Sequence, residues 1–300
     1  MSNMKNNLEI VSDIKANLGE GPVWDHRENI LYWIDIIGKK IFIYDSNKKN
    51  TSSINLNQPI GALALCKTDK LLLALQNGFY FFNKEKNILE QIDDPEQDIP
   101  DNRFNDGKCD ALGRFLAGTT SSGEVEPVGS LYCLDESLKS KKLFNEVIIS
   151  NGLAWSLDNK KMYYIDSPRR EVYSFDYSLN TGEIKNRKVL IKVPENLGYP
   201  DGMTIDTDGY LWIAHWGAYS ICRWDPRKGE IVDKIKIPVK RVSSCTFGGK
   251  NLNELYITTA RMGFSEIGKP LDESSVTQYD GLLFKMTTDT KGIETFLFNN

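Results

Sequence analysis

The chain has 300 residues, of which 40% are hydrophobic and 26% are charged, and its formal net charge is −4. This length allows one large β domain or two ordinary domains, and the absence of a basic stripe argues against a nucleic-acid partner. The N-terminal sequence MSNMKNNLEIV lacks the apolar stretch of a signal peptide, and the apolar runs fall far short of the roughly 20 residues of a membrane helix. The five cysteines form no CxxC pattern, so we expect a reduced, cytoplasmic protein without disulfides and without a membrane partner.

A repeated pattern of strand, turn, apolar strand, loop and strand runs along the chain. The starts of five repeats contain Gly21, Gly61, Gly107, Gly152 and Gly202, which are 40, 46, 45 and 50 residues apart. This period is typical of four-stranded propeller blades, and a single blade cannot bury its own faces. Six such units fill the chain. We therefore predict an all-β fold in which residues 1–300 form a single six-bladed β-propeller domain of four-stranded antiparallel blades.

The N-terminal part of the chain is expected to close the ring. Residues 1–7 are predicted to be a flexible tail, and residues 8–14 a strand that pairs with the C-terminal blade near residues 292–298. In the first unit, the sequence LGEGP places Glu20 in a sharp turn just before a strand. The second unit has Ile60 at the matching place, which indicates a structural role for that unit.

The third unit follows a polar loop that contains two candidate functional residues. Arg103 and Asn105 are two residues apart, so an extended backbone directs both side chains to the same side. The alternative is that Arg103 forms an ion pair with Asp98 or Asp101 and only steadies the loop. Later in the same unit, a longer loop contains Glu124.

The fourth and fifth units begin with Asn151 and Asp201, at the position that Glu20 holds in the first unit. The sixth unit carries a long insertion over residues 261–280. Loops of that length are usually functional or mobile, so we expect this insertion to lie at the rim of the propeller as a lid.

Four polar residues occupy equivalent positions on different units, namely Glu20, Asn105, Asn151 and Asp201. In a propeller, such positions converge at one mouth of the central tunnel. Two carboxylates and two amide groups form an all-oxygen set with a formal charge of −2, which suits a hard divalent cation such as calcium. Zinc or iron would normally recruit histidine or thiolate ligands. The alternative is that these are four unrelated turn residues, since Asn and Asp are common in turns.

Other catalytic motifs are absent from the sequence. A Ser-His-Asp triad needs a well-placed histidine, whereas His26 falls at a predicted hairpin tip and His215 lies inside the apolar run LWIAHW. No GxSxG, P-loop or GxGxxG motif is present. Tyr199 and Trp216 flank the Asp201 region, where they could line a sugar pocket or simply pack in the core.

Several motifs together resemble the senescence marker protein/gluconolactonase/regucalcin family of six-bladed propeller lactonases. They are LGEGPVWD, RFNDGKCDALGRFLAGT, SNGLAWSLDNKKMYYIDS, PDGMTIDTDGYLWIA and FGGKNLNELYITTA, and the resemblance covers nearly the whole chain. It implies one divalent metal ion bound by Glu20, Asn151 and Asp201, with substrate contacts from Arg103 and Asn105. Calcium is the expected ion, and zinc, magnesium, manganese and iron are the alternatives. The family also has a glutamate that touches the sugar. The role of Glu124, in the corresponding segment, stays open.

The reaction that this resemblance implies is hydrolysis of a sugar lactone, such as gluconolactone, to the aldonic acid. The metal acts as a Lewis acid on the ring carbonyl, and Asp201 is the expected general base for the attacking water. Two alternatives from other functional classes are a non-catalytic calcium-binding propeller and an organophosphate or phosphotriester hydrolase. The expected partner is a small-molecule sugar lactone, and the sequence leaves the oligomeric state open.

Overall fold

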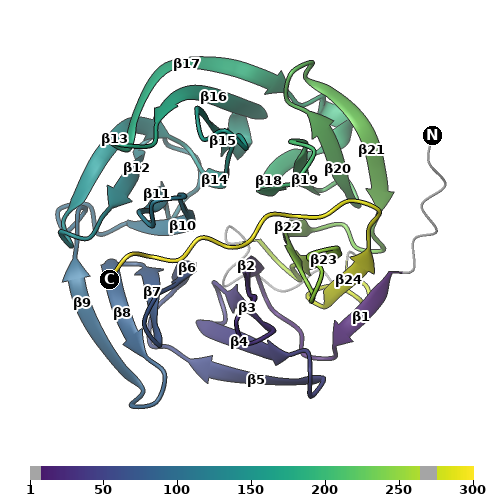
Figure 1. The fold of residues 1–300 in the computed structure, drawn as a ribbon, viewed down its shortest axis with the longest axis horizontal. Coiled ribbons are helices and arrows are strands. Elements are labelled where there is room, and N and C mark those ends of the chain that lie inside the picture. Colours follow the sequence, from purple (N-terminus) through teal and green to yellow (C-terminus); the bar gives the residue numbers. More distant parts are fainter. Residues whose placement is uncertain (1–7, 264–275) are drawn as a thin grey trace.

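The computed structural model describes residues 8–263 and 276–300. Six four-stranded antiparallel sheets stand around a common axis (Figure 1), which confirms the predicted six-bladed propeller. The predicted tail at residues 1–7 and most of the predicted lid at residues 261–280 lie outside the described residues.

Each blade is built from strands that follow one another from the axis outward. Blade one comprises β2 (Gly19–Asp25), β3 (Ile30–Asp35), β4 (Lys40–Asp45) and β5 (Asn50–Asn55). Blade two comprises β6 (Ile60–Leu65), β7 (Lys70–Leu75), β8 (Gly78–Asn83) and β9 (Ile88–Asp93). Blade three comprises β10 (Asn102–Cys109), β11 (Phe115–Ser121), β12 (Gly129–Leu134) and β13 (Ser140–Val147). Blade four comprises β14 (Ser150–Trp155), β15 (Lys161–Asp166), β16 (Glu171–Ser178) and β17 (Glu183–Lys192). Blade five comprises β18 (Tyr199–Ile205), β19 (Leu211–Trp216), β20 (Ser220–Asp225) and β21 (Glu230–Lys236). Two short 3-10 helices, η1 (Ser167–Arg169) and η2 (Glu195–Leu197), lie in loops on blades four and five.

The sixth blade joins the two ends of the chain. It has the order β22 (Val242–Gly248), β23 (Glu254–Thr259), β24 (Leu283–Thr287) and β1 (Glu9–Ser12), so an N-terminal strand closes the ring as predicted. The predicted partner of that strand was wrong, because Glu9 pairs with Lys285 of β24 and not with residues 292–298.

The C-terminal segment instead crosses the propeller. Figure 1 shows it in yellow, running over the centre of the ring from blade six to the far side. It is fastened at both ends, where Gly292 bridges Asp206 and Phe298 bridges Cys66. Phe298 is fully buried among side chains of blades two and three. The apolar residues that suggested a strand thus anchor a crossing segment.

Strands closer to the axis are more deeply buried than strands farther from it. The inner strands β6 (IGALAL) and β14 (SNGLAW) are buried along their whole length, whereas the outer strand β5 (NTSSIN) is mostly exposed. Inner strands are covered on both faces by neighbouring blades, which explains their continuous apolar runs. All five cysteines are buried and free, as predicted. Among the described residues, no helix is long and apolar enough to cross a membrane.

A register shift occurs near the start of the innermost strand in every blade. It falls after Glu20 in β2, Ile60 in β6, Phe104 in β10, Asn151 in β14, Pro200 in β18 and Val242 in β22. Such bulges re-aim side chains and are frequent beside active sites. Glycines allow the neighbouring strands to approach there, because a Cβ at Gly61 would lie 2.1 Å from the carbonyl oxygen of Phe104. The repeat therefore directs equivalent side chains toward the axis.

Candidate active site

The structure brings together the four polar residues that sequence analysis placed at the tunnel mouth. Glu20, Asn105, Asn151 and Asp201 come from the four inner strands β2, β10, β14 and β18, and all four are buried. They line one cavity of about 500 Å³ at the end of the tunnel. This convergence argues against four unrelated turn residues.

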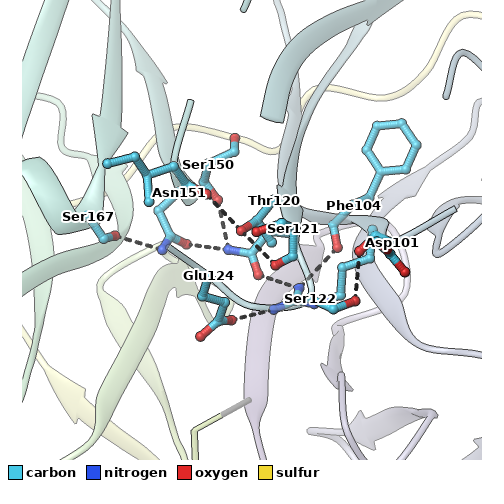
Figure 2. A network of polar contacts seen from close by, with 12 residues as sticks. Asp101, Phe104, Thr120, Ser121, Ser122, Glu124, Ser150, Asn151 and Ser167 are labelled. Carbon is cyan, nitrogen blue, oxygen red and sulfur yellow. Dashed lines mark hydrogen bonds and ion pairs between the residues drawn. The ribbon is translucent and has the colours of Figure 1, made fainter. Parts of the chain in front are cut away.

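A continuous chain of hydrogen bonds fixes the orientation of the two asparagine side chains (Figure 2). Asn105 donates from Nδ2 to Oδ1 of Asn151 at 3.1 Å and to the carbonyl oxygen of Ser150 at 2.7 Å. Asn151 donates from Nδ2 to Oγ of Ser167 at 2.8 Å, and Ser167 donates in turn to the carbonyl oxygen of Pro200 at 2.6 Å. The chain therefore links blades three, four and five, and ends next to Asp201.

Arg103 extends the same network on the other side of Asn105. Its Nη1 donates to Oδ1 of Asn105 at 2.6 Å, and its Nη2 forms an ion pair with Oε1 of Glu124 at 2.6 Å. The structure thus gives Arg103 an acidic loop partner, but this partner is Glu124 and not Asp98 or Asp101. Arg103 is almost fully buried and is not among the residues that line the cavity, whereas Glu124 is.

Ser167 and Glu124 are site residues that sequence reasoning missed or left open. Ser167 gave no signal, because it is the first residue of η1 after β15 and reaches Asn151 of β14 only once the sheet of blade four has formed. Glu124 lies in the loop between β11 and β12, where it has a left-handed φ of 55°. That backbone conformation turns its carboxylate back toward Arg103, which residue spacing alone does not reveal.

The two carboxylates of the site are buried as a like-charged pair. Burial and, to a lesser extent, the negative charge of Asp106 raise the pKa of Glu20 to about 8, against the opposing effect of the Gly21 backbone N–H, which donates to its Oε2 at 3.0 Å. Burial also raises the pKa of Asp201 well above its usual range, and the charge of Glu20 adds to this effect. Ionising Glu20 or Asp201 is therefore energetically unfavourable in the cation-free protein, and a bound cation would reduce this cost.

The donor set fits a hard divalent cation. Within residues 8–263 and 276–300, no three His, Cys, Asp or Glu side chains are grouped to hold a metal ion. Any ion here would depend on the two carboxylates together with the amide oxygens of Asn105 and Asn151. Each amide oxygen accepts one hydrogen bond from its neighbour and keeps a second lone pair. Calcium and magnesium prefer such oxygen ligands.

Neither of the two histidines lines this cavity. His215 is fully buried and shows a pKa lowered to about 4 by burial. Trp224 donates from Nε1 to its Nε2 at 3.2 Å, so its Nδ1 carries the proton and donates to the carbonyl oxygen of Leu197 at 2.9 Å. His26 lies 3.6 Å from Glu294, a residue of the C-terminal crossing segment. Both histidines therefore have structural contacts.

Part of the cavity wall is apolar, although Lys240 and Arg241 also line the cavity. Leu18, Ile36, Val125, Ile149 and Pro168 line it, together with Tyr199 and Trp216. Tyr199 is 41% exposed and stacks with the guanidinium of Arg170 at 4.3 Å from its ring centroid. Trp216 also packs against the core between blades one and two, so it both lines this cavity and contributes to the core.

Comparison with known proteins matches the chain over nearly its full length. The sequence profile of the SMP-30/Gluconolactonase/LRE-like region matches residues 18–261. Regucalcin from Xenopus laevis is 39% identical over 300 residues, covering 98% of each chain. YvrE from Bacillus subtilis (strain 168), provisionally named a sugar lactone lactonase, is 36% identical over 283 residues, covering 94% of this chain and 95% of its own. The solved structure of a luciferin-regenerating enzyme superposes with a TM-score of 0.89 at 34% identity, covering 98% of this chain and all of its own.

Proposed function

The chain belongs to the SMP-30/gluconolactonase/LRE-like family, and from this premise we propose that it is a cation-dependent hydrolase that opens sugar lactones to aldonic acids. The observation that carries the proposal is the convergence of Glu20, Asn151 and Asp201 on one cavity, with Asn105 beside them. The family relationship supports the lactonase class, and the donor set supports the cation. The name of YvrE points to the same substrates.

In this proposal, Glu20, Asn151 and Asp201 hold one divalent cation. When bound, the cation supplies Lewis-acid polarisation of the lactone carbonyl. Beside such a cation, Asp201 would be ionised and could accept a proton from water. The water oxygen attacks the carbonyl carbon, and the ring C–O bond breaks. The proton passes to the ring oxygen as it leaves, so the products are a carboxylic acid and a hydroxyl group.

Substrate positioning falls to the network on blade three. Asn105 and Glu124 line the cavity, where an amide and a carboxylate can hydrogen-bond sugar hydroxyls. Arg103 holds both of them at 2.6 Å, so we propose that it acts on the substrate together with this pair. Fixed donors and acceptors of this kind keep the lactone in a reactive orientation.

The test is a panel of sugar lactones and divalent cations after complete chelation. We expect acid release from gluconolactone and related lactones to disappear with chelator and to return with calcium, and we would compare magnesium, manganese, zinc and iron. A protein that binds calcium at this site but hydrolyses no lactone would instead be a calcium-binding propeller.

A phosphotriester hydrolase is the second candidate, and one observation favours it. The apolar wall of the cavity, which includes Leu18, Ile36 and Val125, suits substituents without hydroxyl groups. We would therefore include an aryl dialkyl phosphate in the same panel. Higher kcat/KM for this triester than for every sugar lactone would assign the site to phosphotriester hydrolysis.

A further inference from the structure

A second hollow, the rim hollow, lies on the same face of the ring as the candidate active site. It has a volume of about 460 Å³ and is lined by residues 57–58, by residues 76–77 and by parts of the segment 94–102. Like the active-site residues, these residues lie at the end of the blades where the inner strands β6 and β10 begin. Among the described residues, none lines both this hollow and the active-site cavity. The reaction proposed above therefore makes no use of it.

Amide side chains make up most of the lining of the rim hollow. They are Asn57, Gln58, Gln76, Asn77, Gln97 and Asn102. A primary amide carries two N–H donors and one acceptor oxygen. The hollow can therefore exchange hydrogen bonds with hydroxyl groups, which also donate and accept.

Two of these amides are held by hydrogen bonds to their oxygens. Oε1 of Gln58 accepts from the backbone N–H of Asn77 at 3.3 Å, and Oδ1 of Asn77 accepts from the hydroxyl of Tyr80 at 3.0 Å. These bonds fix which end of each amide is the acceptor that the protein uses. The NH₂ groups of Gln58 and Asn77 are left as donors for a ligand.

Asp94 adds a stronger acceptor to these donors. Its Oδ1 accepts from the backbone N–H of Glu96 at 3.1 Å, which leaves Oδ2 for a ligand. Hydrogen bonds to an ionised acceptor are roughly twice as strong as neutral ones. Vicinal hydroxyl groups of a sugar match this set, because one can donate to the carboxylate while its neighbour accepts from an amide. Ile99 and Pro100 also line the hollow and can contact the C–H groups of such a ligand.

A buried polar cluster fixes the floor of the rim hollow. Glu96 and Asn102 both line the hollow and are almost fully buried. Asn102 donates from Nδ2 to Oε2 of Glu96 at 3.0 Å, while Thr119 and Tyr132 each donate to Oε1 of that carboxylate at 2.9 Å. The loop that carries Asp94 is thereby attached to blade three, so the hollow is formed before a ligand binds.

The charges around the rim hollow favour a neutral ligand. Asp94 and Glu96 line it, whereas Lys39 and Lys139 lie nearby at exposed positions without lining it. An anion would therefore be repelled. A metal cation would find few ligands, because both oxygens of Glu96 and one oxygen of Asp94 already accept protein hydrogen bonds.

We propose that the rim hollow binds a neutral polyhydroxylated molecule, a sugar or sugar alcohol, at a site separate from the proposed lactonase site. Asp94 accepts a hydrogen bond from one hydroxyl group, and Gln58 and Asn77 donate to others. The two carboxylates of the hollow select against sugar acids. The inference does not depend on lactone hydrolysis, since it concerns other residues and ligands without a lactone ring.

The experiment measures binding of neutral polyols and of a matched sugar acid. The neutral panel contains sorbitol and the methyl glycosides of glucose, galactose and mannose, and gluconate differs from sorbitol by a carboxylate in place of one terminal CH₂OH group. Calorimetric titrations are run in chelator, so that no cation binds these ligands in the active-site cavity. We expect the wild type to bind at least one neutral ligand of the panel and to bind sorbitol more tightly than gluconate.

Asp94→Asn keeps an oxygen for the backbone N–H of Glu96 but removes the charged acceptor. It should weaken binding of the neutral ligands roughly tenfold or more, and it should narrow the difference between sorbitol and gluconate. The matched control is Asp98→Asn, an exposed residue of the same loop that does not line the hollow, and its affinities should equal those of the wild type. Melting temperatures show that the variants are folded.

Three results would overturn the inference. They are no binding of any neutral ligand up to its solubility limit, tighter binding of gluconate than of sorbitol, and wild-type affinities in folded Asp94→Asn. If Asp94→Asn does not fold, Gln58→Ala decides, because it removes one of the proposed donors at the edge of the hollow. Weaker binding of the neutral ligands by Gln58→Ala supports the site, and unchanged binding overturns it. None of these results bears on lactone hydrolysis, so the proposed function is tested independently.

Discussion

Asp201 combines two proposed roles at the residue scale, as a cation ligand and as the base for water. Its carboxylate is buried beside Glu20, and both effects raise its pKa, so it can act as a base only when a cation offsets the repulsion. Asp201→Asn keeps an oxygen donor but removes the charge and the base. We expect calcium affinity to fall, and kcat to fall further, by roughly 10²- to 10⁴-fold.

The matched control for this substitution is Asp225→Asn. Asp225 lies on the same blade, at the end of β20, and bonds Arg227 rather than the site. Its replacement should leave metal affinity and turnover unchanged. Calorimetry and lactone hydrolysis on both variants measure the two effects. Normal calcium binding with full activity in Asp201→Asn would exclude both roles.

Replacing Arg103 distinguishes a role in substrate positioning from a role in loop stability. It bonds Asn105 and Glu124, which line the cavity, so Arg103→Ala should lower kcat/KM for sugar lactones. The loss of a charged hydrogen bond corresponds to roughly 1–3 kcal/mol, or about 5- to 150-fold. Melting temperature, metal content and kinetics are measured on one preparation, with Arg103→Lys as the variant that keeps the charge. Unchanged kinetics with a lower melting temperature would leave Arg103 a structural role only.

Ser167 acts on the proposed cation site through Asn151. Its hydroxyl accepts from Asn151 and donates to Pro200, so Ser167→Ala should free the amide to rotate. Outer partners of metal ligands typically contribute 10- to 100-fold in affinity, and we expect a loss in this range by calcium titration. Ser167→Thr, which keeps a hydroxyl, should retain most of the affinity. Ser220→Ala removes a buried hydroxyl elsewhere and should leave calcium binding intact.

At the scale of elements, the C-terminal crossing segment differs most from the sequence-based prediction. Its C-terminal half is an apolar run of Phe296, Leu297 and Phe298, and residue spacing cannot distinguish a strand from an extended segment that inserts single anchors between blades. The starts of five of the six inner strands were predictable, because a glycine recurs in each of them at a spacing of 40 to 50 residues. The network through Glu124 and Ser167 was not, since it depends on how neighbouring blades pack.

The crossing segment should contribute to stability through Phe298. This side chain is fully buried between blades two and three, and Phe298 also exchanges two backbone hydrogen bonds with Leu65 and Lys67. Phe298→Ala should destabilise the protein by about 3–5 kcal/mol, measured by denaturant unfolding, while the remaining folded protein keeps its kcat/KM. Asn300→Ala, at an exposed position two residues later, is the control. A loss below about 1 kcal/mol would show that the segment is not anchored there.

At the scale of the whole molecule, the fold depends on ring closure, and the site depends on charge at the centre of the ring. The period of 40 to 50 residues predicted the number of blades, because each blade needs neighbours to cover its faces. The same symmetry brings Glu20, Asp106 and Asp201 together from three blades. Sequence position predicted that Glu20 and Asp201 converge, but the strength of their repulsion follows from burial, which only the assembled ring defines.

That repulsion links stability to pH and to calcium. The folded protein raises the pKa of Glu20 from 4.5 to about 8, and that of Asp201 in the same direction. Between about pH 4.5 and pH 8, these carboxylates therefore keep protons in the folded state that they have already released in the unfolded chain. The free energy of unfolding of the cation-free protein should therefore fall as pH rises from about 4.5 to 8, by at most about 1.4 kcal/mol per pH unit for each proton retained.

Calcium should remove this dependence, because it binds the ionised carboxylates and is favoured as their protons leave. We expect the difference in melting temperature between calcium and chelator to widen from pH 5 to pH 8, and apparent calcium affinity to rise over the same range. Glu20→Gln removes one of the two titrating carboxylates, so its melting temperature in chelator should depend less on pH. If the wild type in chelator instead gains stability from pH 5 to pH 8, the buried carboxylates are already ionised in the folded ring, and the proposed coupling between protons and cation does not hold.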